Sequence, residues 1–247
     1  MIASLPMYAR PETAAAQERF WDLVRAADGQ APALTQPSDL WQHWEAPDLY
    51  LSQTCGLPFR ARLHSKVDLI GSPDHGIAGI PSGHYHSVLV VRADDSRDDF
   101  AAFHGASLAL NDRLSQSGWA APLAHASQSG IRLTPVLQTG SHVASARAVA
   151  HGRADIAGID VVTWTLMTRH DRWTDDLRVI AKTAPTPALP FVTARGRDAA
   201  TIRAGLSHAI AALDADDRDA LCLHGLVHIP ARDYRAIPIP PAPQLPN

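Results

Sequence analysis

Side chains suited to acid–base or nucleophilic chemistry gather in residues 139–160, whose sequence is TGSHVASARAVAHGRADIAGID. Ser141 and His142 precede a run of small residues, and Asp160 closes the stretch. Such side chains are compatible with an active site, a metal site or the edge of a binding cleft. His142 and Asp160 are too far apart in sequence to share one helical face, so the fold decides whether they meet.

The pattern of this region predicts a strand, a helix and a second strand. Residues 132–139 form a strand pattern, Ser141 suits the N-cap of a helix that ends at Gly152, and the second strand ends near Asp160. A right-handed crossover makes the two strands parallel. Ser141, His142 and Asp160 then lie at the carboxyl edge of one sheet, where open α/β folds bind ligands.

Two further turns have the same polar character. Ser115, Ser117 and Gly118 follow a strand pattern and begin a helix, where unpaired backbone N–H groups and the helix dipole favour an anionic oxygen. A third turn after a strand contains Gln53, Thr54 and Cys55. Together the turns predict a polar pocket built mostly from neutral hydrogen-bond donors.

Strand and helix patterns alternate along the chain, which predicts an α/β fold with a largely parallel sheet. We expect strands at 2–6, 32–36, 48–54, 67–73, 86–92, 105–111, 132–139, 154–159, 176–183 and 189–194. We expect helices after Pro11, at 39–45, 117–127 and 141–151, and two within 197–225. The proline-rich tail, 237–247, is expected to be extended.

Composition narrows the functional classes. The 247 residues are 46% hydrophobic and 19% charged with a net charge of −3, which is typical of a globular protein. Clustered Lys and Arg are lacking, which argues against nucleic-acid binding, and no apolar run reaches the ~20 residues of a membrane span. His84 and His86 lack an accompanying HExxH or CxxC motif, and the two cysteines, Cys55 and Cys222, are too few for a zinc motif, so we expect no metal and no cofactor.

Four segments resemble the PhnD-like family of phosphate, phosphonate or phosphite ABC-transporter substrate-binding proteins, which have the type II periplasmic binding protein fold. They are ASLPMY, QTCGLP, SQSG, and the stretch 139–160 followed by VTWTL. The resemblance extends from Ile2 to about Val192. It implies two α/β lobes joined by two crossover strands with a cleft between them. Lobe one would be 1–88 plus 187–247, and lobe two 89–186.

The resemblance also implies ligand-binding positions, which fall on Tyr8, Gln53, Thr54, Cys55, Tyr85, Ser115, Ser117, Gly118, Ser141, His142 and Asp160. The two serine turns would donate hydrogen bonds to an oxyanion, and a protonated His142 would add a charge-assisted donor. Tyr8 and Tyr85 would close over the ligand, and Asp160 would accept from a protonated oxygen or an amine.

Three functions follow as hypotheses. The first is a solute-binding protein, a monomer or weak dimer, that captures a small oxyanion or compact polar metabolite for an ABC permease without turnover. The second is an enzyme of the same fold that uses His142 with Cys55, or Ser117 with His142 and Asp160. The third is a cytoplasmic ligand-sensing domain. Residues 1–8 lack the features of a signal peptide, so we expect a cytoplasmic location if the chain is whole and a periplasmic one if a leader was removed.

Overall fold

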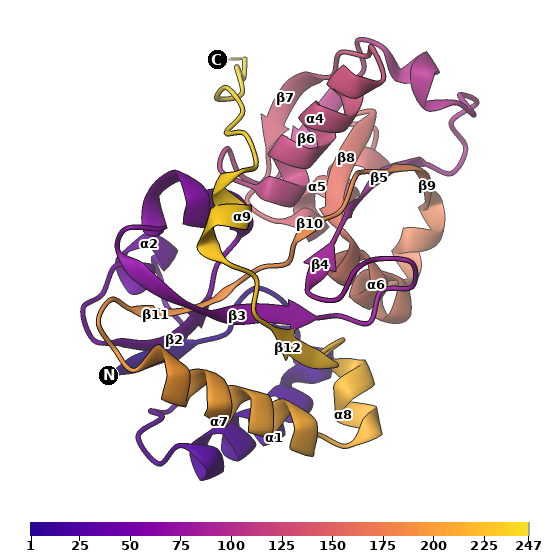
Figure 1. The fold of residues 1–247 in the computed structure, drawn as a ribbon. Coiled ribbons are helices and arrows are strands. Elements are labelled where there is room, and N and C mark those ends of the chain that lie inside the picture. The colour runs from indigo at the N-terminus through magenta and orange to yellow at the C-terminus, as the bar shows by residue number, and fades with distance from the viewer. Residues whose placement is uncertain (247) are drawn as a thin grey trace. The chain divides into compact units, whose positions relative to one another are not determined.

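The chain forms two α/β units in a computed structural model that describes residues 1–246. Unit 1 comprises Met1–His84 and Pro187–Pro238, and unit 2 comprises Tyr85–Thr186 and the chain from Ile239 onward. Each unit holds one five-stranded sheet (Figure 1). The predicted α/β class is confirmed.

The sheet of unit 1 has the strand order β1-β2-β11-β3-β12. Its strands are β1 (Ile2–Ser4), β2 (Leu49–Gln53), β11 (Phe191–Ala194), β3 (Val67–Asp74) and β12 (Gly225–Val227). β1 and β2 are parallel, whereas β11 is antiparallel to both β2 and β3, and β12 is antiparallel to β3. Because β2 and β3 both oppose β11, the carboxyl ends of β1, β2 and β3 lie at one edge.

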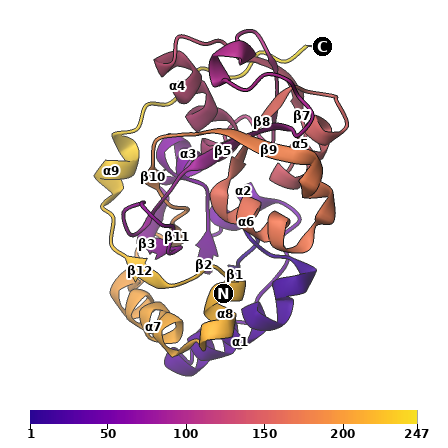
Figure 2. The same cartoon turned by 90° about the vertical axis from the view of Figure 1, so that its right-hand side faces the viewer.

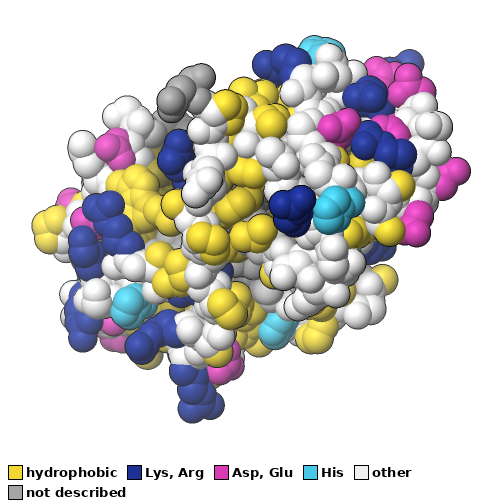
Figure 3. Space-filling model, turned by 90° about the horizontal axis from the view of Figure 1, so that it is seen from above, with side chains coloured by type: hydrophobic (Ala, Val, Ile, Leu, Met, Phe, Trp, Pro, Cys, Tyr) yellow, Lys and Arg dark blue, Asp and Glu magenta, His cyan; other side chains and the backbone are white. Residues whose placement is uncertain are grey.

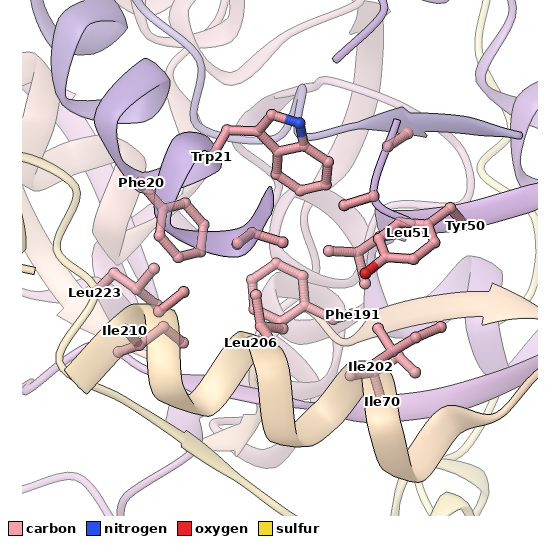
Figure 4. Packing of buried hydrophobic residues seen from close by; sticks show 14 of the residues in the cluster. Phe20, Trp21, Tyr50, Leu51, Ile70, Phe191, Ile202, Leu206, Ile210 and Leu223 are labelled. Atoms are coloured by element: carbon pink, nitrogen blue, oxygen red, sulfur yellow. The ribbon is translucent and has the colours of Figure 1, made fainter. Parts of the chain in front are cut away.

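Helices cover both faces of this sheet. α1 (Ala14–Ala27) and α7 (Ala199–Ala212) lie on one face, with α8 (Ala215–Ala220) beside them (Figure 2). In α1, Ala16, Phe20 and Val24 are buried at helical spacing. Figure 4 shows how the side chains of α1 and α7 meet those of the strands in one apolar layer.

The opposite face of the unit 1 sheet packs against shorter helices. These are α2 (Leu40–Trp44), α3 (Gly56–Pro58), the following turn η2 (Phe59–Leu63) and α9 (Ala231–Arg235). Asp39 begins α2 as its N-cap, since its carboxylate accepts from the N–H groups of Trp41 and Gln42. Phe59 and Tyr234 stack edge to face in the core of this layer.

The sheet of unit 2 has the strand order β7-β6-β8-β5-β9. Its strands are β7 (Thr134–Gln138), β6 (Ser107–Leu110), β8 (Ile156–Asp160), β5 (Ser87–Arg92) and β9 (Leu177–Lys182). β7, β6 and β8 are mutually parallel, while β5 is antiparallel to its neighbours β8 and β9. The predicted strand–helix–strand unit over 132–160 is confirmed, with β6 lying between its two strands.

Successive side chains of β5 point to opposite faces of the sheet, and the core of unit 2 accordingly has two layers. Val88 and Val90 face α5 (His142–Ala150) and α6 (Val161–His170). Leu89 and Val91 face the opposite layer. That layer contains the 3-10 turn η3 (Phe100–Phe103), the turn η4 (Gln116–Ala120) and α4 (Ala121–Gln128). A further 3-10 turn, η5 (Arg172–Asp176), leads into β9.

Two sequence predictions about the sheets are wrong. The sheets are mixed rather than largely parallel, because β5, β9, β11 and β12 each run antiparallel to a neighbour. The segment 32–36 is not a strand, since Leu34 makes only a single bridge to Ala3. Local sequence patterns identify a strand but carry no information on the direction from which the chain enters it.

The chain passes between the units at three places. Two are the short strands β4 (His84–Tyr85) and β10 (Thr186–Pro187), which pair in a sheet of their own, and the third is residues 238–239. The units therefore differ from the predicted lobes at 85–88 and at 239–247. Val88 pairs with strands of unit 2 on both sides, and in the tail Pro241 accepts a hydrogen bond from Trp119 Nε1 at 3.0 Å.

Charged side chains of both signs lie on the surface of the molecule (Figure 3). On the face seen in Figure 3, basic and acidic side chains are interspersed. Among residues 1–246, no helix has the length and apolar character needed to cross a bilayer.

Candidate functional site

The carboxyl edge of unit 2 brings three predicted turns together. The residues that follow β6, β7 and β8 lie at one edge because these strands are parallel neighbours. These residues are the Ser115–Gly118 turn, Ser141 with His142, and Asp160. The sequence prediction that Ser141, His142 and Asp160 share an edge is confirmed.

The Ser115–Gly118 turn is a buried, tightly packed helix start. Ser115 is the N-cap, and its Oγ accepts from the Gly118 N–H at 2.9 Å. A Cβ on Gly118 would lie 1.9 Å from Asn111 Oδ1, so a larger residue here requires the Asn111 side chain or the turn to shift. The first turn of the helix that continues into α4 is thus held with its N–H groups at the edge of the sheet.

His142 joins two of the turns. Its Nε2 lies 2.8 Å from Ser117 Oγ, and its Nδ1 lies 3.2 Å from the carbonyl oxygen of Gly158. A carbonyl only accepts, so Nδ1 carries the proton and Nε2 accepts from the Ser117 hydroxyl. Burial lowers the pKa of His142 to about 4. Without a bound anion His142 is therefore neutral at pH 7, whereas the predicted protonated donor concerns the complex with an oxyanion.

Asp160 is almost fully buried at the end of β8. Its Oδ1 accepts from the N–H groups of Val162 at 2.8 Å and Thr163 at 3.3 Å, so it is the N-cap of α6. The orienting partner of His142 is the Gly158 carbonyl and not this carboxylate. The residues of a hydrolytic triad are present at the edge, but they are not connected as one.

Ser141 and Tyr85 have different environments. Ser141 is exposed at the N-cap of α5, where its Oγ accepts from the Ala144 N–H at 3.1 Å. Tyr85 in β4 is among the most deeply buried large side chains, with 1% of its surface exposed. Ser141 is thus accessible to solvent, whereas Tyr85 is enclosed.

His86, which the sequence analysis considered only for a metal motif, lies next to this edge. His86 is 5% exposed, and its carbonyl accepts from the Val161 N–H at 3.1 Å, next to the Asp160 cap. Within residues 1–246, neither ring nitrogen has a hydrogen-bond partner. Burial, reinforced by Lys182, lowers its pKa. Its only sequence signal is its position directly after Tyr85.

The carboxyl edge of unit 1 contains the remaining predicted residues. Tyr8 follows β1 and stacks edge to face on His75, with ring centroids 5.4 Å apart. Gln53 ends β2, and its Nε2 donates to the Leu189 carbonyl at 3.0 Å. Tyr8, Gln53 and His75 line one cavity.

Thr54 and Cys55 complete the third predicted turn. Thr54 is fully buried, and its N–H donates to the Pro190 carbonyl at 3.1 Å. Cys55 is half-buried at the start of α3 and does not cap it with its side chain. Cys55 and Cys222 are not joined in a disulfide, and no group of three metal-ligating side chains occurs in the described part of the chain.

A match to a family model identifies the protein family to which the two-unit fold and its polar sheet edges point. The model for the ABC transporter, phosphonate, periplasmic substrate-binding protein matches residues 61–231. The chain belongs to this family. The resemblance found in the sequence is thereby confirmed, and membership of the phosphonate-binding family gives the chain a solute-binding role in ABC-type uptake. No curated protein matches the chain.

Solved structures similar to this member of the phosphonate-binding family include PhnD1 from Prochlorococcus marinus in complex with methylphosphonate. That structure has a TM-score of 0.76 and 16% identity, and covers 96% of this chain and 94% of its own. XAC2383 from Xanthomonas citri bound to chloride ion has a TM-score of 0.69 and 16% identity, with 96% and 95% covered. A histidine kinase sensor domain similar to periplasmic binding proteins has a TM-score of 0.61 and 16% identity, with 93% and 98% covered. These likenesses establish the periplasmic-binding-protein fold.

Proposed function

We propose that this protein captures a small phosphorus oxyanion of the phosphonate, phosphate or phosphite class and presents it to an ABC permease in the periplasm. The observation that carries the proposal is the convergence of two helix starts, at Ser115–Gly118 and Ser141–His142, on one edge of unit 2. Helix starts supply N–H donors and a positive dipole end, which together suit an anion.

The neutral state of His142 determines which hydrogen-bond donors and acceptors this edge presents to a ligand. Because the Ser117 hydroxyl donates to His142, its oxygen can still accept a hydrogen bond. The Ser115 and Ser141 caps use the N–H groups of Gly118 and Ala144, so the donors of the edge are the other N–H groups of the two first helical turns. The Asp160 carboxylate is also an acceptor. An oxyanion that retains one proton on an oxygen satisfies donors and acceptors at once, which favours a partly protonated phosphorus oxyanion over a fully deprotonated one.

The same geometry supports capture without turnover. A histidine whose pKa is about 4 is a weak general base at neutral pH, and the carboxylate of Asp160 is occupied as a helix cap. The complex of the similar PhnD1 with methylphosphonate supports the ligand class. The similar histidine kinase sensor domain favours ligand sensing as the second candidate function.

Calorimetric titration with methylphosphonate, phosphite and phosphate tests the proposal. At a ligand concentration near 100 times Kd, binding should add about 2.7 kcal/mol to the free energy of unfolding. Ser117→Ala should weaken binding, whereas Ser207→Ala, at an exposed position on α7, should leave it unchanged. Absence of heat and of stabilisation with all three anions would overturn the phosphorus-oxyanion assignment.

A further inference from the structure

The C-terminal tail, residues 239–246 of the described chain, belongs to unit 2 and contains neither helix nor strand. Five of the ten residues 237–246 are proline. Proline fixes its own φ and holds the preceding residue in an extended conformation, so a segment of this composition is extended before it docks. Because proline has no N–H group, the segment presents mainly carbonyl oxygens to whatever binds it.

Unit 2 holds this tail through Trp119. The indole Nε1 donates to the Pro241 carbonyl at 3.0 Å. Pro243 is buried although Ala242 and Gln244 on either side of it are exposed, and Leu245 packs against the core cluster that contains Trp119. The tail runs past α4 (Figure 2). Proline-rich peptides are recognised in aromatic-lined grooves, and the contact between Trp119 and the tail has that character.

Trp119 lies in the turn that carries the proposed oxyanion site. It follows Gly118 in η4 and is almost fully buried. Two residues earlier, Ser117 contacts His142, with 2.8 Å between Oγ and Nε2. There is little free space here, since a Cβ on Gly158 would lie 2.7 Å from the Ser117 carbonyl oxygen. Because a close-packed segment transmits displacement, a shift of the Trp119 indole changes the position of the N–H groups of this turn.

The tail is fixed at its start but has few contacts of its own. In unit 1 the Pro238 carbonyl accepts from Arg60 Nη2 at 3.1 Å. Only Ile239 and Pro240 separate this anchor from Pro241, and Ile239 is 58% exposed. The covalent connection keeps the tail at a high effective concentration near its docking surface, so few contacts suffice to hold it. A segment with few buried contacts also opens locally at a lower free energy than the core.

We propose that the C-terminal tail is a detachable proline-rich ligand of unit 2, whose docking on Trp119 positions the Ser115–Gly118 turn for the oxyanion. The inference rests on the proposed function and adds a control of affinity to it. Trp119 is a positioning residue, because it contacts the tail and acts on the ligand through the turn. Release of the tail lowers the affinity for the oxyanion, and binding of the oxyanion strengthens tail docking by the same factor, since coupling is reciprocal.

The full chain carrying both Pro243→Ser and Leu245→Ser tests the proposal, because these changes remove the apolar contacts of the tail and leave residues 1–242 unaltered. In ¹⁵N-tryptophan-labelled protein, the Trp119 indole N–H resonance is identified by its absence in Trp119→Phe. The double variant should move this resonance and speed its hydrogen exchange about tenfold or more. Methylphosphonate affinity in calorimetry should fall about fivefold or more. Ala242→Ser with Gln244→Ser is the matched control at exposed positions of the same tail, and it should change neither quantity.

Rescue in trans separates positioning from a general loss of packing. A synthetic peptide of residues 237–246, IPIPPAPQLP, is added at millimolar concentration to the double variant. It should restore the Trp119 resonance and the methylphosphonate affinity, whereas the same peptide with serine at 243 and 245 should do neither. Saturating methylphosphonate should tighten binding of the peptide by the factor that the peptide gives to methylphosphonate. Leu245→Ser alone is the milder variant should the double variant fail to fold, and it should move both quantities in the same direction.

The outcomes distinguish this inference from the proposed function. An unmoved Trp119 resonance, an unchanged methylphosphonate affinity after release of the tail, or a peptide that restores neither quantity would overturn the positioning role. Absence of methylphosphonate binding in the wild-type protein would overturn the oxyanion assignment instead, and the Trp119 resonance would still decide whether the tail is a detachable ligand of unit 2.

Discussion

At the scale of single residues, two glycines allow chain segments to approach one another closely at the carboxyl edge of unit 2. Gly118 adjoins Asn111, and a Cβ on Gly158 would lie 2.7 Å from the Ser117 carbonyl oxygen. Both glycines have ordinary negative backbone angles, so the requirement is for space and not for conformation. The serine turn can reach His142 because these two positions lack side chains.

Gly118→Ala should therefore disrupt the oxyanion site. The added methyl group would overlap Asn111 Oδ1 at 1.9 Å, so the Asn111 side chain or the turn has to shift, and overpacking of this kind costs about 1–3 kcal/mol. We expect methylphosphonate affinity to fall at least tenfold in calorimetry. Gly29→Ala is the control, because a Cβ there meets nothing within 4 Å. Unchanged affinity in Gly118→Ala would show that this turn does not bind the ligand.

His86→Phe should affect stability and binding in opposite directions. Both ring nitrogens of His86 are buried without a partner in the described chain, so an apolar ring of similar shape should raise the free energy of unfolding by about 1 kcal/mol or more. If His86 contacts the oxyanion beside Asp160, methylphosphonate affinity should fall about tenfold. Urea unfolding and calorimetry measure the two effects, with the exposed His104→Phe as the control. A variant that is more stable and binds normally would remove His86 from the site.

At the scale of secondary-structure elements, those helices and strands could be predicted whose signals lie within their own sequence. The strand, helix and strand predicted within residues 132–160 are correct, because their signals are all local in sequence: the helix cap, the apolar stripe and the glycine that ends the helix. The short elements β12 and α9 were missed, since three to five residues carry too little periodicity. The burial of His75 and His86 was not predicted, because it depends on elements distant in sequence.

The C-terminal tail is an element without helix or strand that nevertheless stabilises unit 2. Trp119 Nε1 donates to the Pro241 carbonyl, and Leu245 packs against the core cluster that contains Trp119. Removal of residues 239–247 should lower the free energy of unfolding by about 1–3 kcal/mol, from the lost hydrogen bond and apolar contact. Trp119→Phe removes the same hydrogen bond together with part of the buried indole packing, so it should also lower the free energy of unfolding. Urea unfolding checks both, and an unchanged midpoint after truncation would contradict a stabilising role for the tail.

At the scale of the whole molecule, each unit has two apolar layers, one sheet and one polar edge with a buried histidine. His75 in unit 1 and His142 in unit 2 both have a pKa lowered to about 4 by burial. In both, Nδ1 donates to a backbone carbonyl, which holds Nε2 as an acceptor. The two units thus share a sensitivity to acid, although their edges offer different chemistry.

This arrangement predicts that the protein loses stability between pH 6.5 and about 4. In the unfolded chain a histidine takes up a proton near pH 6.5, whereas in the folded protein His75 and His142 resist protonation until about pH 4. Their contribution is therefore complete above pH 6.5 and declines as the pH falls, by roughly 2 kcal/mol for each histidine at pH 5. Asp74 and His224 act on His75 with opposite signs, so burial remains the leading cause of its shift.

Urea unfolding of the wild type at pH 7 and pH 5 measures this loss, and His142→Gln isolates one part of it. The variant cannot take up the proton, so its stability should decline less steeply over the same interval, even if it is less stable at pH 7. Carboxyl groups with lowered pKa values, such as those of Asp155 and Asp217, become protonated only at lower pH. Their contribution to stability therefore does not change between pH 7 and pH 5. Equal slopes for wild type and variant would mean that His142 is already charged in the folded protein, and the proposed donor and acceptor roles at the oxyanion edge would have to be exchanged.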